Sequence, residues 1–307
     1  MSRIHEALKK AEQDRAAGVE STAEASPVTP LPVPTVEESA GIDHAPPAKF
    51  PFSGLQSGVP GSLESWVSSC PVASWKPNPE CVLFSNPVQR KLGTEEFRTL
   101  RTHLSQMREK LPLQTVLITS ALPGEGKTFV AVNLAEAFVQ QKGRRVLLMD
   151  CDLRLSRIHT LLGAARAPGL SEYLESKVEI PEIMQRGEPD NFYFIPGGKG
   201  SSNPMELIGN GRLKGLLHRL APLFDWIVLD SPPCVPLSDA SLLADFADGV
   251  LMVVQSGKTP FDMAQKGTRQ FREKRLLGVV LNQVALQAAY SAYYYHASSD
   301  GVTKEES

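Results

Sequence analysis

The sequence predicts a doubly wound α/β domain, in which helices cover both faces of a mostly parallel sheet. Apolar runs of Val, Leu and Ile alternate with helical segments from about residue 82 to residue 284. The runs lack the polar alternation of half-exposed strands, as expected of parallel strands that are buried on both faces. Acidic residues follow several of the runs, and the carboxyl edge of such a sheet would bring them together.

Composition is that of a chain with one large domain or two small ones. The 307 residues are 42% apolar and 21% charged, with a formal net charge of -2, which is enough for a sizeable core. The nearly balanced charge argues against a protein that coats nucleic acid, so no nucleic-acid partner is expected. No apolar run reaches the roughly 18 residues of a membrane-spanning helix, and the four cysteines match no zinc or disulfide spacing. We expect a cytoplasmic protein for which any membrane role comes through a partner.

The first 81 residues differ in texture from the rest of the chain. Residues 1–17 place apolar side chains on one helical face, which predicts an N-terminal helix that either frays or docks on a partner. Residues 18–81 are rich in proline and serine and lack periodicity, which predicts a disordered linker. Trp66 and Trp75 stand out in it, either as isolated anchors or as a short docking motif. The α/β domain is expected over residues 82–286, followed by a flexible tail over residues 287–307.

The elements of the α/β domain follow from the period of the apolar residues. A helix over residues 91–110 carries Phe97, Leu100 and Leu104 on one side. The apolar runs predict strands at residues 115–119, 145–149, 192–195, 226–229, 250–254 and 278–281. Helices are predicted from residue 126, at 158–162, from 204 and 212, near 240–245 and at 261–274.

The strongest motif is Ala121-Leu-Pro-Gly-Glu-Gly-Lys-Thr128, between a predicted strand and a helix. Its spacing is that of a Walker A loop, with Ala121 in place of the first glycine. The glycines turn backbone N–H groups toward phosphate oxygens, and the helix N-terminus adds positive charge. Lys127 would reach the β- and γ-phosphates, and the Thr128 hydroxyl would bind Mg²⁺. An ordinary glycine-rich turn is the alternative. The candidate nucleotide-binding residues are Pro123, Gly124, Glu125, Gly126, Lys127, Thr128 and Phe129.

Two further motifs place acidic residues at strand ends. Asp150-Cys-Asp152-Leu-Arg154 follows one strand, and Asp230-Ser-Pro-Pro follows another with the form of a Walker B motif. One aspartate of the first pair would orient Mg²⁺ and the other would accept a hydroxyl proton, although a capping aspartate is the alternative. Asp150 is the candidate base and Asp152 a candidate metal ligand with Thr128 and Asp230, and the first two assignments are open to exchange. The fold class is therefore of the P-loop NTPase type, with Walker A, A′ and B motifs.

The three motifs, in this order, resemble those of a known family. Glu95-Glu-Phe-Arg98-Thr-Leu-Arg101 precedes them, and Tyr290, Tyr293, Tyr294 and Tyr295 form a cluster behind them. The set resembles the bacterial protein-tyrosine autokinases of capsule and exopolysaccharide synthesis (BY-kinases), over about residues 82–295. It is similar to the cytoplasmic kinase subunit of that family. Leu155 and Ser156 depart from the Arg and Pro that are common at these positions.

The resemblance implies an ATP- and Mg²⁺-dependent tyrosine kinase that phosphorylates its own tail in trans within a homo-oligomeric ring. Lys127, Asp150 and Asp152 would be catalytic, and the four tail tyrosines would be phosphoacceptors. Glu95, Arg98 and Arg101 would form subunit contacts; a solvated charged helix face is the alternative. Asn282, at the end of the last strand, would contact the adenine base. The implied partners are a transmembrane polysaccharide co-polymerase that activates the kinase and a cognate tyrosine phosphatase.

Two other functions fit parts of the sequence. A partition- or septum-type ATPase switch shares the fold, but it carries a lysine directly after the first loop residue, where this chain has Leu122. That class of protein also leaves the tyrosine cluster unexplained. A non-catalytic nucleotide-binding regulator of polysaccharide assembly would keep the loop and transfer no phosphate, and the sequence alone does not separate it from a kinase.

Overall fold

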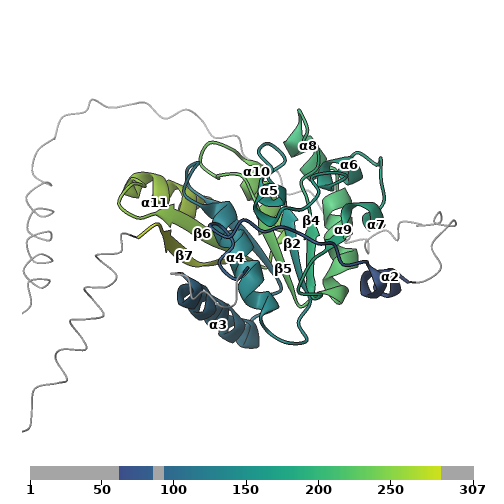
Figure 1. The fold of residues 1–307 in the computed structure, drawn as a ribbon. Helices are drawn as coiled ribbons and strands as arrows, with labels where there is room; N and C mark the ends of the chain where they lie inside the picture. The colour runs from purple at the N-terminus through teal and green to yellow at the C-terminus, as the bar shows by residue number, and fades with distance from the viewer. Residues whose placement is uncertain (1–61, 86–92, 285–307) are drawn as a thin grey trace, which may run out of the picture. The chain divides into compact units, whose positions relative to one another are not determined.

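The computed structural model describes residues 62–85 and 93–284. Seven strands form one sheet in the order β3-β4-β2-β5-β1-β6-β7 (Figure 1). Neighbouring strands run parallel except for β3, which is antiparallel to β4. The predicted mostly parallel sheet is therefore confirmed. The strands are β1 (Thr115–Ser120), β2 (Val146–Asp150), β3 (Gln185–Arg186), β4 (Phe192–Ile195), β5 (Trp226–Asp230), β6 (Gly249–Gln255) and β7 (Leu276–Asn282).

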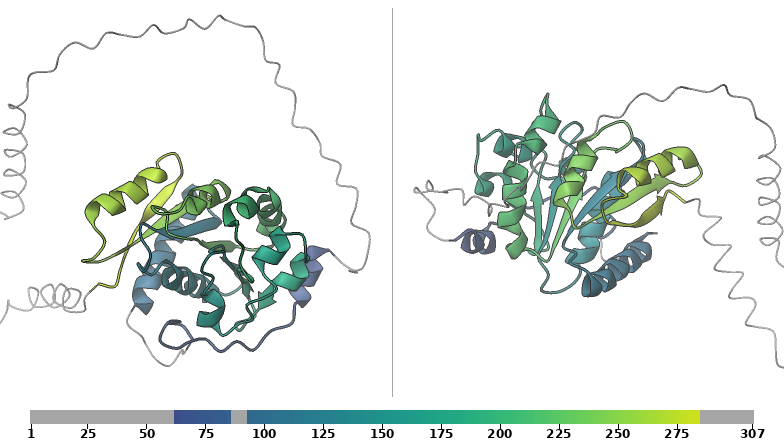
Figure 2. Two further views of the ribbon diagram at one scale, coloured as in Figure 1. Left: turned by 90° about the horizontal axis from the view of Figure 1, so that it is seen from above. Right: turned by 180° about the vertical axis from the view of Figure 1, so that it is seen from behind.

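Helices lie on both faces of the sheet (Figure 2). One face is covered by α3 (Thr94–Lys110), α4 (Lys127–Val139) and α5 (Ile158–Leu162). On the other face, the helices Leu63–Ser69, Leu170–Leu174 and Ile180–Ile183 were not predicted from the sequence, and neither was the two-residue strand β3. That face carries α2 (Leu63–Ser69), α6 (Leu170–Leu174), α7 (Ile180–Ile183), α8 (Pro204–Gly209), α9 (Arg212–Leu220), α10 (Asp239–Leu243) and α11 (Phe261–Gln270).

Helix α4 is the central helix of its layer, and it leads directly from the phosphate-loop motif. Every residue from Val130 to Val139 is buried, because the sheet, α3 and the segment before α3 surround the helix. Such a helix is apolar on all sides rather than amphipathic. Asn133 is an exception whose side chain accepts a hydrogen bond from Leu83 N at 2.7 Å and donates one to Cys81 O at 2.8 Å. The start of α4 is thus held on a rigid scaffold.

Residues 62–85, which we call the N-terminal strap, belong to the folded domain. Val67 of α2 is fully buried in the core, and Val72 forms a parallel bridge with Arg186 of β3. Trp75 packs edge-on against Phe192 and Phe194 of β4, with ring centroids 5.4 and 6.1 Å apart. The predicted disordered linker is therefore wrong for residues 62–81, whereas residues 1–61 lie outside the described residues. Trp66 also packs against the core. The burial of apolar surface by the two tryptophans offsets the conformational entropy lost when the proline-rich strap is ordered.

Truncation of the Trp75 side chain should destabilise the domain. We expect Trp75→Ala to lower the free energy of unfolding by about 2–4 kcal/mol, because a large aromatic contact is replaced by a cavity. Urea denaturation followed by circular dichroism measures the change. Ser74→Ala, at the exposed neighbouring position, is the control and should change the free energy by less than about 0.5 kcal/mol. Equal stability of Trp75→Ala and wild type would show that the strap adds nothing to the domain.

Glu136 makes the stability of the domain depend on pH. Its side chain is buried in α4, and burial raises the pKa of this carboxyl from 4.5 to about 7. The folded state therefore holds the proton more tightly than the unfolded state. The contribution of the protonated Glu136 side chain to the free energy of unfolding is therefore complete below about pH 4.5. It is lost as the pH rises through about 7.

Removal of the Glu136 charge should remove this dependence. Between about pH 5.5 and about pH 8.5 the wild type should lose about 2 kcal/mol more unfolding free energy than Glu136→Gln. Urea titrations at the two pH values measure it. Glu109→Gln changes an exposed glutamate of α3 and should follow the wild type. Parallel pH profiles for wild type and Glu136→Gln would contradict the prediction.

Strand β7 differs from the expectation that both sheet faces are covered. Val279 and Leu281 are 52% and 58% exposed, so this expectation is wrong for the β7 edge within the described part of the chain. All four cysteines are free thiols. Across residues 62–85 and 93–284, helices long and apolar enough to cross a membrane are lacking.

Candidate active site

The phosphate-loop motif forms the connection between β1 and α4, as predicted. Gly124 and Gly126 have φ angles of +84° and +91°, a region that favours glycine. Gly126 precedes the first residue of α4, so the N–H groups of the helix start face the loop. A Cβ at Gly126 would lie 2.0 Å from Asn282 Nδ2, so a larger residue here would displace the Asn282 side chain.

Residues at or just after the ends of β6 and β7 hold the phosphate-loop motif in place through hydrogen bonds to Glu125. The buried Glu125 carboxylate accepts a hydrogen bond from Leu122 N at 2.6 Å and another from the Thr259 hydroxyl. Asn282 Nδ2 donates to the Glu125 carbonyl oxygen at 2.9 Å. Asn282 therefore lies beside the loop, where its expected adenine contact stays a prediction. Thr259 was missed in the sequence because no motif marks it.

The predicted lysine, threonine and acidic residues meet at the carboxyl edge of the sheet. Asp150 and Asp230 are register partners on β2 and β5. Lys127 Nζ lies 2.9 Å from Asp152 Oδ2 and 3.8 Å from Asp230 Oδ1. The Thr128 hydroxyl donates to Asp230 Oδ2 at 2.7 Å. Two carboxylates thus share the Lys127 ammonium group at the entrance to the phosphate loop.

The Asp150 carboxylate is hydrogen-bonded to the turn before α5 rather than to the phosphate loop. It accepts hydrogen bonds from Ser156 Oγ at 2.8 Å, Arg157 N at 3.1 Å and Ile158 N at 3.2 Å. A fourth bond comes from Asp152 N at 3.2 Å. These contacts fix the turn that leads from β2 to α5. Asp150 therefore orients the segment that carries Asp152, which corresponds to the capping alternative for one aspartate of the pair.

Burial and mutual repulsion perturb the acidic residues. Burial, with Asp230 nearby, raises the pKa of Asp150 to about 7. Burial also raises the pKa of Asp230 to about 6, although Lys127 opposes the shift. Burial lowers the pKa of Lys127, but Asp230 and Asp152 outweigh it, and the net shift is upward. The neighbouring carboxylates thus keep the Lys127 ammonium charged, and a charged ammonium is suited to binding phosphate.

The side chains present fit a magnesium nucleotide. Asp230 Oδ1 is buried without a hydrogen-bond partner, and the Thr128 hydroxyl lies beside the same carboxylate. Mg²⁺ prefers oxygen ligands and binds through one or two protein groups together with phosphates and water. The described residues contain no group of three or more His, Cys, Asp or Glu side chains arranged for a metal. Such a site would therefore be completed by nucleotide phosphates.

A further ion pair joins the turn after β2 to the start of α10. Arg154 donates to both carboxylate oxygens of Asp239, at 2.7 and 3.1 Å, and Asp239 is fully buried at the start of α10. Asp152 Oδ1 accepts from Leu155 N at 3.0 Å, so the turn after β2 is fixed on both sides of Arg154. The motif had pointed to Arg154, but its partner Asp239 lies 85 residues further along the chain and carries no sequence signal.

Other candidate residues lie away from this centre. The Phe129 side chain packs against Phe97 of α3 rather than toward the loop. Glu95 and Arg98 form an ion pair at the surface of α3, whereas Arg101 donates to Ala137 O at 2.9 Å. Arg101 is thus already engaged at the C-terminal end of α4, where a cation is favourable. The four tail tyrosines lie outside the described residues.

Comparison with known proteins is consistent with this geometry. A family model described as an AAA domain matches residues 114–275. The tyrosine-protein kinase YwqD of Bacillus subtilis (strain 168) is 33% identical over 213 residues, which cover 69% of this chain and 89% of YwqD. The chain belongs to the bacterial tyrosine-protein kinase family. The kinase also resembles the kinase domain of the Escherichia coli tyrosine kinase ETK, with 28% identity and a TM-score of 0.64 over 75% of this chain and 89% of that domain.

Some relatives are much longer than the matched region. The tyrosine-protein kinase wzc of Salmonella typhimurium is 30% identical over 270 residues, which are 80% of this kinase but only 37% of wzc. The resemblance seen in the motifs and the P-loop fold class are thereby confirmed. This chain is a protein-tyrosine kinase with a nucleotide-binding P-loop domain. The roles of individual site residues stay predictions.

Proposed function

We propose that this kinase transfers the γ-phosphoryl group of ATP to tyrosines of its own tail, in trans within a ring of copies. The observation that carries the proposal is the Lys127 ammonium held between Asp152 and Asp230, beside the Thr128 hydroxyl. An ammonium at the phosphate loop offsets the charge that develops on the transferring group. The acceptors would be Tyr290, Tyr293, Tyr294 and Tyr295.

Each side chain of the site has a distinct task in this proposal. Asp230 and Thr128 would hold Mg²⁺, which supplies charge neutralisation at the phosphates when bound. Asp152, which contacts Lys127, would orient the tyrosine hydroxyl and accept its proton. The role of base thus moves from Asp150 to Asp152, because the Asp150 carboxylate is occupied by internal donors. Asp150 is then a positioning residue.

The weak basicity of an aspartate does not prevent this role. A tyrosine hydroxyl has an ordinary pKa near 10, far above that of a carboxylate. In a loose transition state, however, the proton moves late, and orientation of the hydroxyl contributes more than basicity. The rigid turn around Asp152, fixed by Asp150 and by the pair of Arg154 with Asp239, supplies that orientation.

The cellular part of the proposal rests on the family resemblance. The kinase would regulate the synthesis and export of an exopolysaccharide or capsule. A transmembrane co-polymerase would activate it at the inner membrane, and a cognate phosphatase would reverse the reaction. Glu95 and Arg98, exposed on α3, are available for contacts between copies, whereas Arg101 would have to keep its bond to α4.

A mixing experiment tests transfer in trans. One chain keeps the active site but has all four tail tyrosines replaced by phenylalanine; the other carries Lys127→Met and an intact tail. With Mg-ATP, mass spectrometry should find phosphotyrosine on the tail of the Lys127→Met chain only when both chains are present. Phosphate on an isolated wild type but never in the mixture would overturn transfer in trans. Absence of phosphate everywhere, even with the cytoplasmic segment of the activator added, would favour a nucleotide-binding regulator.

A further inference from the structure

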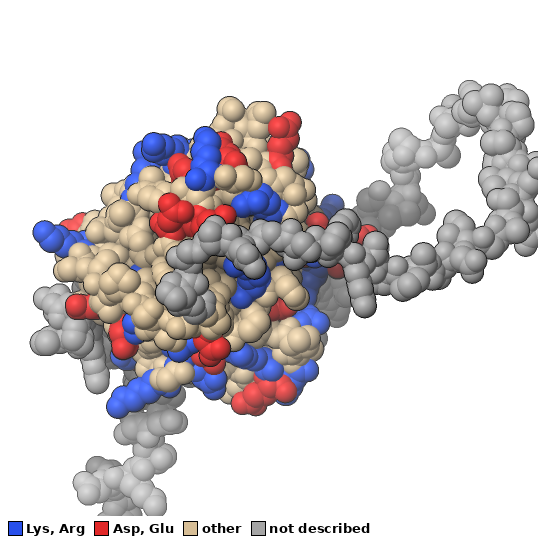
Figure 3. All heavy atoms as spheres, turned by 90° about the vertical axis from the view of Figure 1, so that its right-hand side faces the viewer, with Lys and Arg blue, Asp and Glu red and all other residues tan. Residues whose placement is uncertain are grey.

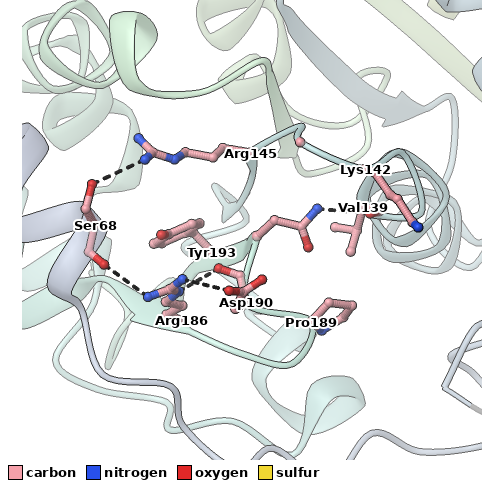
Figure 4. A pocket seen from close by; sticks show the side chains of 10 residues that line it. Ser68, Val139, Lys142, Arg145, Arg186, Pro189, Asp190 and Tyr193 are labelled. Atoms are coloured by element: carbon pink, nitrogen blue, oxygen red, sulfur yellow. Dashed lines mark hydrogen bonds and ion pairs between the residues drawn. The ribbon is translucent and has the colours of Figure 1, made fainter.

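A cavity of about 500 Å³ opens at the amino edge of the sheet, beside the starts of β2 and β4. The side chains of Arg145 and Arg186 extend toward Ser68 of the N-terminal strap, with Tyr193 between them (Figure 4). Sites for small ligands typically measure about 300–1,000 Å³. Arg145 directly precedes β2 and Asp150 ends it, so the length of this strand, about 16 Å, separates the cavity from the candidate active site.

The lining of the cavity carries an excess of positive charge. Lys142, Arg145 and Arg186 contribute three cations, whereas Asp190 contributes one carboxylate. Asp190 pairs with Arg186 at 3.3 Å but is 77% exposed, and such a pair is weak. The Arg145 guanidinium donates to the neutral Ser68 hydroxyl, and the Arg145 backbone N–H donates to Asp225 Oδ2 at 2.9 Å. Neither the Arg145 guanidinium nor Lys142 has an ion-pair partner among the described residues. The cavity is therefore suited to an anion.

Hydrogen bonds hold the Arg186 guanidinium firmly, and one hydrogen bond orients that of Arg145. Ser68 Oγ accepts a hydrogen bond from Arg145 at 3.2 Å, and Ser68 O accepts one from Arg186 at 3.2 Å. Arg186 also donates to Cys70 O at 3.2 Å and lies 5.6 Å from the centroid of the Tyr193 ring. The Tyr193 hydroxyl in turn donates to Val67 O at 3.0 Å. Because the side chains are already ordered, binding costs little further conformational entropy.

The shape and chemistry favour a phosphate group attached to a larger body. A guanidinium presents a planar fork of donors that matches phosphate oxygens, and most donors of Arg145 are unused by the described residues. The volume exceeds that of a bare phosphate, and Val139 and Pro189 supply apolar wall. On the side of the molecule where α2 lies, basic and acidic side chains are interspersed (Figure 3). The positive charge is therefore local to the cavity and does not form a broad membrane-binding field.

We propose that this cavity binds a phosphomonoester, and that its ligand is phosphotyrosine on the tail of another copy of this chain. The identity of the ligand rests on the proposed function, because that reaction makes phosphotyrosine. Since the cavity and the active site lie at opposite edges of the sheet, a phosphorylated tail occupies the cavity without blocking catalysis. The arrangement links the phosphorylation state of one copy to its contact with the next.

Calorimetric titration of the full-length chain tests the proposal. We would use Lys127→Met in excess Mg-ADP, so that the tail is unphosphorylated and the phosphate loop is filled. The probes are a peptide of residues 287–297 phosphorylated at Tyr293, the same peptide without phosphate, and inorganic phosphate. The phosphopeptide should bind at least tenfold more tightly than either control probe. Binding needs no catalysis, so this result is independent of whether the chain proves to be an active kinase.

Two neighbouring arginines provide matched variants in the same background. Arg145→Gln should weaken phosphopeptide binding at least tenfold, whereas Arg144→Gln, which removes the same charge from an arginine paired with Asp225, should change it less than twofold. Arg145→Lys keeps the charge and should give an intermediate loss if the glutamine variant fails to fold. Absence of phosphopeptide binding, or equal losses in the two glutamine variants, would overturn the site. Inorganic phosphate binding as tightly as the phosphopeptide would overturn phosphotyrosine as its ligand.

Discussion

Replacement of Lys127 with methionine should reduce tyrosine phosphorylation at least about a thousandfold. The Lys127 ammonium contacts both Asp152 and Asp230 beside the phosphate-loop motif, where we expect the phosphates of a bound nucleotide. Loss of a preorganised charge at a transferring group typically costs two to three orders of magnitude, and loss of a phosphate-binding lysine also weakens nucleotide binding. Initial rates of phosphotyrosine formation with Mg-ATP measure the effect.

The control for this prediction is Lys214→Met, which removes an exposed lysine of α9. It should keep the wild-type rate, so that a change in net charge alone is excluded. Far-UV circular dichroism of Lys127→Met should match the wild type, because the segment around the site is held by Asp150, Glu125 and Arg154 rather than by Lys127. A Lys127→Met chain that retains more than a tenth of the wild-type rate would contradict the assigned role.

The two aspartates of the second motif should differ in their response to amide substitution. Asp152→Asn should lower the rate about 10²–10⁴-fold, because it removes the carboxylate that shares the Lys127 ammonium and would accept the hydroxyl proton. Asp150→Asn should lower the rate by about tenfold or less, because an amide oxygen still accepts hydrogen bonds from Ser156 and the turn before α5. Steady-state rates at saturating ATP separate the two.

Truncation supplies the matched comparison for Asp150. Asp150→Ala leaves the Ser156 hydroxyl and several buried N–H groups without an acceptor, each at about 1–3 kcal/mol. It should therefore lower both stability and activity more than Asp150→Asn does. If Asp150→Asn instead abolishes activity at unchanged stability while Asp152→Asn remains active, Asp150 is the base, as first assigned.

Much of the candidate site was predictable because its parts are local in sequence. A loop that cradles phosphate needs its glycines, lysine and threonine within a few residues, between a strand and a helix. The acidic residues were predictable for a related reason, since parallel strands bring their carboxyl ends to one edge. Lys127, Thr128, Asp152 and Asp230 are accordingly found together.

The incorrect expectations concern segments whose state depends on distant partners. Residues 62–81 have the composition of a linker, but Trp75 finds Phe192 and Phe194, and Val67 enters the core. Strand β7 has the apolar run of a central strand, yet it lies at the sheet edge with Val279 exposed. The composition of a segment indicates the average entropy cost of ordering it. Whether the segment is ordered depends on how much apolar surface it buries against the rest of the fold.

The sequence by itself determined the family, the mostly parallel sheet with six of its seven strands, and the identity of the phosphate loop and its acidic partners. Only the tertiary structure decided how these residues divide their tasks. Asp150 is turned inward by donors from the turn before α5, Arg154 is joined to Asp239, and Glu125 is held by Thr259. The physical reason is that hydrogen bonds and ion pairs join whichever groups the packed elements bring within about 3 Å, and that proximity is a property of the fold rather than of any motif.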